Sequence, residues 1–291
     1  MTLRNDALEA EVDQARRVLQ VSATTPAALS GFEGTSGEGG GRYVLEGPLT
    51  PANAAALRAA FANLRPALIG PSQTSVGTGD RLGLATPGHV RAFQASGGAV
   101  VPVFAQQSIR EMDRLGRDAQ SVMDDATFGA VAAGWTGAVG ADCDHIKTTE
   151  GIDRGLAAGF TMFTLDPGDH VVDVRGGVTQ VDVLPWAELE DDIDALRARY
   201  VGTTLDLGDR QVTIGEDEIL TAAVKYGECV VDARRLYRHL VDNARHEVEV
   251  EIAVDETAFV TSFVEHYYLA TELRRLGVEW VSFAPRYADG F

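Results

Sequence analysis

Short apolar runs alternate with helix-like patterns along the chain from about residue 50 onward. The apolar runs are rich in β-branched residues, which is typical of strands covered on both faces. They predict six strands, at residues 66–70, 99–106, 139–146, 160–166, 247–256 and 278–285. Apolar residues three to four positions apart predict helices between them. This alternation indicates parallel strands joined by βαβ crossovers.

Capping residues mark where several of these helices begin. Thr86 is the predicted N-cap of a helix, and Ser108 and Ser121 are expected to cap the next two. Ser262 and Glu265 have the spacing of a capping box before the helix that precedes the last strand.

Two parts of the chain depart from this rhythm. Residues 1–49 are predicted to form an N-terminal helix, over residues 3–19, and a Gly-rich linker, SGFEGTSGEGGG. The remainder, residues 50–291, contains an insertion at about residues 171–246. Within it we expect a hairpin from His170 to Pro185, an acidic helix over residues 188–200 and a long helix over residues 219–242.

Composition excludes several classes of partner. The formal net charge of −18 argues against nucleic acid and against an anionic membrane surface, because both attract basic proteins. No apolar run approaches the roughly 20 residues that span a bilayer, and the acidic N-terminus is unlike a signal peptide. The two cysteines provide neither a disulfide framework nor a zinc-type pairing. We therefore expect a cytoplasmic protein that binds no nucleic acid and no membrane.

Chemically reactive residue types follow five of the predicted strands. The sequences are GDR, QQS, DCDHIK, DPGDH and DET, and they follow the first five strands in chain order. In a parallel α/β fold, the carboxyl ends of the strands surround the active site. These strand ends are therefore predicted to share one site.

Six long stretches of the chain carry a family resemblance. They include GADCDHIKT at residues 140–148 and PVFAQQSIREM at residues 102–112, and the others lie at residues 71–92, 122–135, 158–171 and 264–287. Taken in their order along the chain, these stretches resemble the tagaturonate/fructuronate epimerase family. The resemblance implies a metal-dependent sugar-acid epimerase of carbohydrate metabolism with a barrel-like α/β fold.

The predicted fold class is α/β, a TIM-barrel-like parallel (β/α) barrel with an α/β insertion. A closed barrel of this type needs eight strands, and the sequence predicts six. Members of the family are also longer than this chain. We therefore expect an incomplete barrel, arising from a fragment, a truncated gene or a partial barrel completed by a partner, with homo-oligomers as one outcome of its open edges.

The implied reaction is the conversion of D-tagaturonate to D-fructuronate in hexuronate catabolism. The inverted carbon lies one position beyond the carbon next to the ketone, so its C–H proton is not acidic. We therefore expect retro-aldol cleavage, rotation of the aldehyde fragment and re-addition. A divalent cation (Zn, Mn or Ni) is the expected electrophile.

The resemblance and the strand ends together assign candidate residues. Asp144 is the expected base and Glu256, chosen over its neighbour Asp255, the second acid/base. His145 and His170 are the expected metal ligands.

The remaining candidates bind a small-molecule sugar acid. Arg81 and Lys147 suit its carboxylate, Gln106 and Gln107 suit its hydroxyls, and Asp80 is assigned to the same group. Three alternatives remain open: a metal-dependent ketose aldolase, a Schiff-base enzyme that uses Lys147, and an inactive, truncated paralogue that binds a sugar acid.

Overall fold

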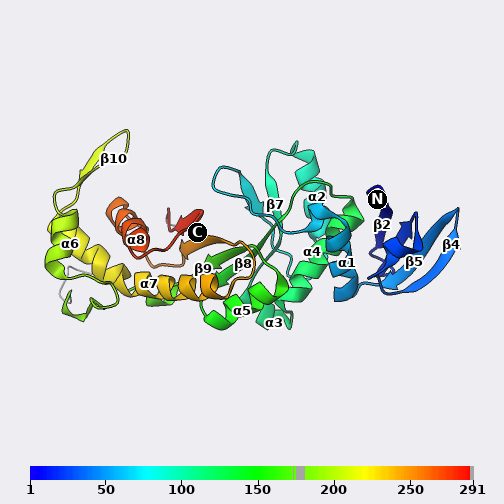
Figure 1. The fold of residues 1–291 in the computed structure, drawn as a ribbon. Coiled ribbons are helices and arrows are strands. Elements are labelled where there is room, and N and C mark those ends of the chain that lie inside the picture. The colour runs from blue at the N-terminus through cyan, green and yellow to red at the C-terminus, as the bar shows by residue number, and fades with distance from the viewer. Residues whose placement is uncertain (173, 175–180, 289–291) are drawn as a thin grey trace. The chain divides into compact units, whose positions relative to one another are not determined.

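A computed structural model describes residues 1–172, 174 and 181–288 (Figure 1). The predicted hairpin from His170 to Pro185 includes residues 173 and 175–180, and to that extent lies outside the described residues. Within the described part of the chain, the fold is α/β.

The central feature is a parallel sheet of six strands among the described residues, in the order β13-β12-β9-β8-β7-β6. Each strand lies beside the strand of the same sheet that precedes it in the chain, as in a (β/α) barrel. The pairs β6–β7, β7–β8 and β12–β13 are parallel. The six strands are consistent with an incomplete barrel, because a closed one has eight. Their bounds are Ser75–Gly77, Val101–Ser108, Gly140–Ile146, Met162–Leu165, Glu249–Val254 and Ser282–Pro285 for β6, β7, β8, β9, β12 and β13.

Helices connect these strands, largely where the sequence predicts them. Ser108 caps α3 by accepting a hydrogen bond from the Glu111 N–H, and Ser262 and Glu265 form the predicted capping box of α8. The next cap differs: Asp118 is the N-cap of α4, and Ser121 is the third residue of its capping box. The α-helices are α1 Pro51–Ala60, α2 Thr86–Ala95, α3 Ile109–Leu115, α4 Ala119–Ala133, α5 Thr149–Ala158, α6 Ile193–Tyr200, α7 Glu216–Asn243 and α8 Phe263–Arg275, with 3-10 turns at Pro26–Leu29, Ala62–Leu64, Gly168–His170 (η3) and Val181–Val183.

The prediction of an N-terminal helix is wrong. Residues 1–49 contain an antiparallel five-stranded sheet in the order β1-β2-β3-β5-β4. In β2, Leu8, Ala10 and Val12 are buried while the residues between them face outward, a two-residue period that a strand requires. The strands are β1 Leu3–Arg4, β2 Leu8–Asp13, β3 Val18–Ala23, β4 Thr35–Gly39 and β5 Arg42–Pro48.

Two further predictions are corrected. The Gly-rich segment is not a linker, because β4 and β5 form a hairpin across it. The strand predicted at residues 66–70 is reduced to one bridge between Pro66 and Val139, and β6 occupies the edge of the sheet instead. Pro66 has no N–H to donate, and Gly70 adopts a left-handed φ of 74°, so neither residue continues a strand. The division of domains at residues 49 and 50 stays a prediction.

The insertion contains the two predicted helices, α6 and α7, and a hairpin that the sequence pattern did not predict. Its strands are β10 Thr204–Asp206 and β11 Gln211–Thr213. Asp206 accepts a hydrogen bond from the Gly208 N–H within the connecting turn. Such short exposed strands carry little apolar periodicity, which explains why they were missed.

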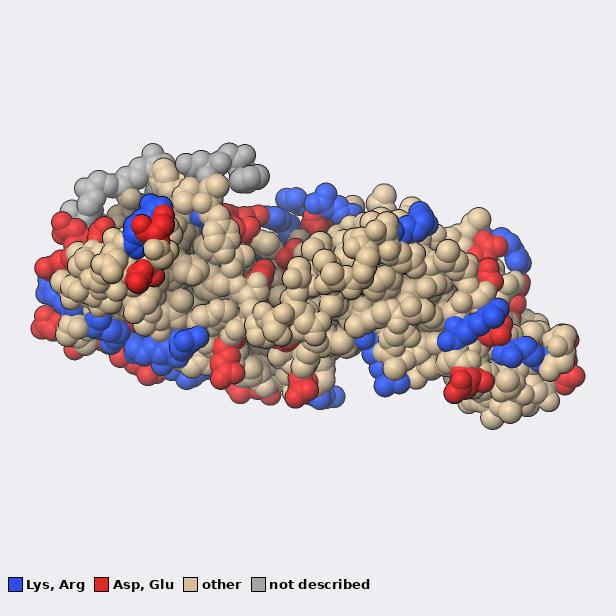
Figure 2. All heavy atoms as spheres, turned by 90° about the horizontal axis from the view of Figure 1, so that it is seen from above, with Lys and Arg blue, Asp and Glu red and all other residues tan. Residues whose placement is uncertain are grey.

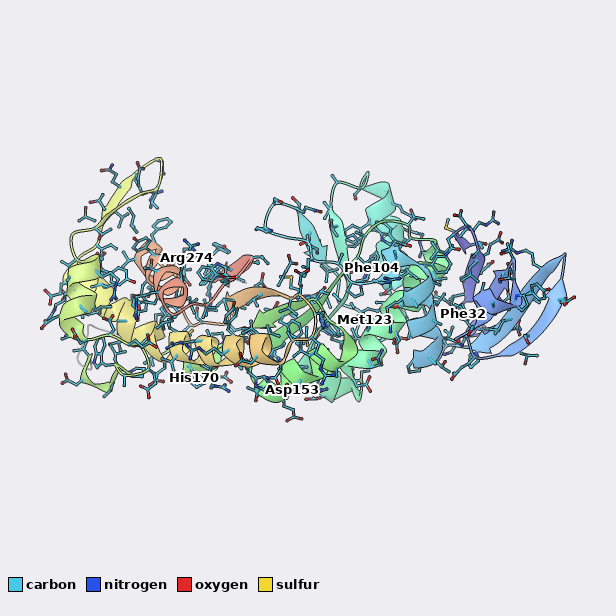
Figure 3. The ribbon with its side chains drawn as sticks, in the orientation of Figure 1. Phe32, Phe104, Met123, Asp153, His170 and Arg274 are labelled. Atoms are coloured by element: carbon cyan, nitrogen blue, oxygen red, sulfur yellow. The ribbon has the colours of Figure 1, made fainter. Side chains whose placement is uncertain are left out.

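The chain divides into two compact units. Unit 1 comprises residues 1–144, 150–163 and 244–249, and unit 2 comprises residues 145–149, 164–243 and 250–291. In unit 1, Phe104 of β7 lies near Met123 of α4 (Figure 3) and packs edge-to-face against Phe93 and Trp135. In unit 2, Tyr226 of α7 and Tyr268 of α8 are buried in the core.

The surface carries both signs of charge despite the acidic composition. Figure 2 shows Lys and Arg side chains as well as Asp and Glu on the face in view. No helix of the described chain combines the length and the apolar character that crossing a membrane requires.

Candidate active site at the strand ends

The end of β8 contains a break in the alternation of the strand. His145 adopts a left-handed backbone conformation with φ of 48°. Asp144 and His145 are both half-buried, whereas the residues on either side of them, Cys143 and Ile146, are buried. A regular strand would place neighbouring side chains on opposite faces. The positive φ therefore leaves both Asp144 and His145 accessible, which the predicted roles of base and ligand require.

The other residues of this strand have structural positions. Cys143 is buried beneath Gly155 of α5, as expected for a small apolar group, and burial raises the pKa of its thiol. Cys229 on α7 is equally buried, and burial raises its thiol pKa as well. Asp142 is also buried. Neither thiol has the exposed, electropositive environment of a reactive cysteine.

Within unit 2, His145 faces a carboxylate from the end of β12. Its Nε2 atom lies 3.4 Å from Oδ1 of Asp255. The hydrogen bond from His145 lowers the pKa of Asp255 below its usual range, against the opposing effect of burial. Asp255 thus contacts the imidazole directly. Glu256 is exposed, and its role as an acid/base stays a prediction.

The ammonium of Lys147 lies between two carboxylates of unit 2. Its Nζ is 2.7 Å from Oδ1 of Asp169 and 3.4 Å from Oδ2 of Asp166. Burial alone would lower the pKa of Lys147, but the hydrogen bond to Asp169 and the charges of both aspartates raise it overall. Lys147 therefore stays protonated at neutral pH, which does not suit a Schiff-base nucleophile.

Asp166 is a residue that the sequence analysis did not single out. It follows β9, and Gly168 N–H donates to its Oδ1 at 2.8 Å. Within the described residues, Oδ2 accepts no hydrogen bond, and it forms an ion pair with Lys147. Burial raises the pKa of Asp166, more than Gly168, Lys147 and His145 lower it. The signal for it was present in DPGDH, where Asp166 is the first polar residue after an apolar strand.

The predicted metal ligands do not form a metal centre by themselves. His170 lies beside α7 (Figure 3). Its Nε2 is 3.7 Å from Oδ1 of Asp232 on α7, a carboxylate that Arg235 also binds. The described residues include no group of three or more His, Cys, Asp or Glu side chains that could hold an ion. His145 and Asp255 are suitable donor types, but two donors are fewer than a stable site needs. The metal site and its ligands stay a prediction.

Asp80, in unit 1, binds the backbone at the start of α2, and its role in substrate binding stays a prediction. Its carboxylate accepts hydrogen bonds from the N–H groups of Leu84, Ala85 and Thr86 at 2.7–3.0 Å. Burial would raise the pKa of Asp80, but these N–H groups lower it overall. The prediction that Thr86 is the N-cap of α2 is wrong, because Thr86 is the first residue inside the helix. The Asp80 carboxylate binds the N–H groups at the helix N-terminus instead. Its acceptor sites are thus occupied by the protein.

The other substrate-binding candidates of unit 1 have protein partners as well. Arg81, which is exposed, pairs with Glu111. The side chain of Gln106 packs over Gly77 of β6. Gln107 is buried and accepts a hydrogen bond from Arg117 at 3.0 Å. Arg117, which the sequence analysis missed, also binds Asp125 at 2.6 Å and orders this corner of the unit.

Sequence and structure comparisons identify similar proteins. The family model described as UxaE, tagaturonate epimerase, matches residues 10–291. A tagaturonate/fructuronate epimerase of Thermotoga maritima is 36% identical over 264 residues, which cover 90% of this chain and 53% of the relative. The native crystal structure of fructuronate-tagaturonate epimerase UxaE from Cohnella laeviribosi has a TM-score of 0.83 at 28% identity, and a complex of that enzyme with two glycerols has 0.85. Both matches cover 100% of this chain and 59% of the other. The chain thus spans about half the length of the curated relative.

Proposed function

Because the chain belongs to the tagaturonate epimerase family, we propose that it takes part in the interconversion of D-tagaturonate and D-fructuronate in the cytoplasm. The observation that carries this proposal is the grouping of His145, Lys147, Asp166 and Asp255 in unit 2. These residues lie at or just after the ends of three strands of a parallel sheet, the position where α/β enzymes carry their chemistry. The ammonium can bind the carboxylate of a sugar acid, and the imidazole and the carboxylates can form hydrogen bonds with its hydroxyl groups.

The position of the inverted carbon selects the mechanism. Its C–H proton is too far from the ketone to be acidic, so we propose cleavage and re-formation of a C–C bond. A base takes the hydroxyl proton on that carbon, and the bond to the neighbour nearer the ketone breaks. Its electrons form the enediolate of one fragment, and the other fragment is an aldehyde that carries the carboxylate. After the aldehyde rotates, the bond re-forms on its other face and the proton returns to the oxygen.

Asp144 is our proposed base, and Glu256 the proposed second acid/base. The accessibility of Asp144 supports this, because a base must reach the hydroxyl from which it takes the proton. Lys147 is proposed to bind the carboxylate of the sugar acid through its protonated amine. That carboxylate stays with the fragment that rotates, so this contact holds the fragment in the site.

We also propose that the reaction depends on a divalent cation. A bound Zn, Mn or Ni ion would supply stabilisation of negative charge. The protein is dialysed against each ion, and its metal content is then measured by elemental mass spectrometry. This measurement tests the metal dependence separately from the reaction.

The decisive experiment is conversion of D-tagaturonate followed by NMR, with Zn, Mn or Ni added in turn. We expect D-fructuronate to form, and Asp144→Asn to lower kcat by about 100-fold or more, in line with the loss of a general base. Asp153→Asn is the matched control, because Asp153 is exposed on α5 (Figure 3). If no D-fructuronate forms with Zn, with Mn or with Ni, the proposal is contradicted.

Trapping the three-carbon aldehyde distinguishes an aldolase from an epimerase. An epimerase keeps both fragments in the site until they recombine, so an added aldehyde reagent should capture little product. Accumulation of the trapped fragment in proportion to substrate consumed would instead assign a ketose aldolase.

A further inference from the structure

Lys147 contacts two carboxylates that differ in their exposure. The side chain of Asp166 is 2% exposed, that of Asp169 is 71% exposed, and that of Lys147 is 32% exposed. Asp169 is nevertheless the nearer partner, at 2.7 Å against 3.4 Å. One ammonium therefore has a buried partner and an exposed one.

The buried partner is held in place by the protein. Asp166 follows β9 directly, and the Gly168 N–H orients its carboxylate through Oδ1. Oδ2 remains for the ammonium, since it accepts no hydrogen bond within the described residues. Removing one member of a buried charge pair leaves the other uncompensated, so this contact is not readily exchanged.

The exposed partner is exchangeable. Asp169 lies in the short η3 turn, and its carboxylate is largely in water. Exposed ion pairs contribute little free energy, because water and salt screen them. A carboxylate from a ligand offers the ammonium the same chemistry as Asp169.

We propose that Asp169 occupies the carboxylate-binding position of Lys147 until the carboxylate of a hexuronate displaces it, while Asp166 positions the ammonium. This inference rests on the proposed function, because it takes the ligand to be a sugar acid. Asp169 is then an internal competitor. Only molecules in which the Lys147–Asp169 pair is broken can bind the substrate carboxylate, so the apparent affinity is the intrinsic affinity multiplied by the fraction of such molecules.

Asp169→Asn removes the competitor. We expect the concentration of D-tagaturonate that half-saturates the protein to fall by about threefold to fivefold, the range of an exposed ion pair, with kcat unchanged. Asp113→Asn is the matched control, because Asp113 forms an exposed pair with Arg154 at 2.9 Å and its loss changes the net charge equally. D-tagatose, which lacks the carboxylate, should bind both proteins alike.

Asp166→Asn tests the positioning role. The half-saturating concentration of D-tagaturonate should rise by about tenfold, whereas that of D-tagatose stays constant. A merely structural defect would weaken both sugars, and unchanged thermal unfolding of the variant excludes misfolding.

Binding can be measured without turnover, because Lys147 and Lys225 are the only lysines. Lys225 is 8% exposed and pairs with Glu265 at 3.0 Å, so it serves as an internal reference. Limited acetylation followed by peptide mass spectrometry should show that D-tagaturonate protects Lys147 but leaves Lys225 unaffected. Half-protection should need about threefold less sugar in Asp169→Asn.

The outcomes separate this inference from the proposed function. Turnover without protection of Lys147, or equal half-protection in wild type, Asp169→Asn and Asp113→Asn, overturns the inference and leaves the epimerase proposal standing. Absence of both protection and turnover overturns both.

Discussion

At the scale of single residues, the backbone of His145 is the feature on which the candidate site depends. A left-handed φ of 48° is uncommon for a residue with a side chain, and histidine, asparagine and aspartate tolerate it best. The conformation keeps His145 beside Asp255. Non-glycine residues in such conformations concentrate at functional sites, where the surrounding structure imposes them.

Substitutions of His145 should separate the backbone from the chemistry. We expect His145→Asn to keep the free energy of unfolding within about 1 kcal/mol of wild type, because asparagine tolerates a positive φ. His145→Val should lose about 1–3 kcal/mol, because a β-branched residue is strained there. Urea denaturation gives both values. Equal stability of the two variants would contradict the strain.

The sequence predicted residue contacts less well than residue types. Asp144, His145 and Lys147 were recognisable as a reactive cluster after an apolar strand. The contact of Asp255 with His145 was not, since it joins two residues more than 100 positions apart along the chain. The contact of Asp80 with the backbone of α2 was not recognisable either. Its capping role requires the turn to fold back, which no linear pattern encodes.

Lowering the pH should weaken the contact between Asp80 and α2. The pKa of Asp80 is lower in the folded protein than in the unfolded chain, so its contribution is complete above the unfolded value and is lost as pH falls through the folded value. We expect this loss below about pH 4. Asp80→Asn should cost about 1–2 kcal/mol at pH 7 and flatten the decline. Unfolding measured from pH 2 to 7 tests it; an identical decline in the variant would refute it.

At the scale of elements, strands and helices with regular periods were predicted and short ones were not. The strands β7, β8, β9, β12 and β13 follow from apolar runs, because burial on both faces leaves an unbroken signal. In the sheet of residues 1–49, Leu8, Ala10 and Val12 alternate, but the charged residues between them also fit an amphipathic helix, so the pattern predicts the wrong element. Edge strand β6 has only three exposed residues and gave no signal.

Close packing of α5 on the sheet provides a test at this scale. A Cβ atom at Gly155 would lie 2.8 Å from Cε1 of Phe163 and 3.0 Å from Sγ of Cys143. Gly155→Ala should therefore reduce the free energy of unfolding by about 1–3 kcal/mol. Gly88→Ala is the control in α2, where the nearest atom is Nη2 of Arg91 at 3.9 Å, and should raise stability by up to about 1 kcal/mol. A loss in both would point to a general effect of removing glycine.

At the scale of the whole molecule, charge is the dominant property. A net charge of −18 destabilises any folded state through self-repulsion, and the surface has few lysines to offset it. The same charge favours solubility. Association into homo-oligomers stays a prediction, which light scattering in solution would test.

Salt should therefore stabilise the protein. Raising NaCl from about 0.1 M to about 1 M shortens the screening length from about 10 Å to about 3 Å. We expect Tm to rise with salt at pH 7, and the rise to vanish near pH 4.6, where the net charge approaches zero. Calorimetry at both pH values checks this; a salt response that ignores pH would exclude self-repulsion as its cause.

The buried thiols have a practical consequence for work with this protein in air. Oxidants and alkylating reagents attack the thiolate, and burial raises the thiol pKa of both Cys143 and Cys229, so almost no thiolate is present at neutral pH. Peroxide or iodoacetamide should leave both thiols unmodified in the native chain and react with them only once it unfolds. The protein can accordingly be handled without reductant, and alkylation of either cysteine reports how much of a preparation has lost its native structure.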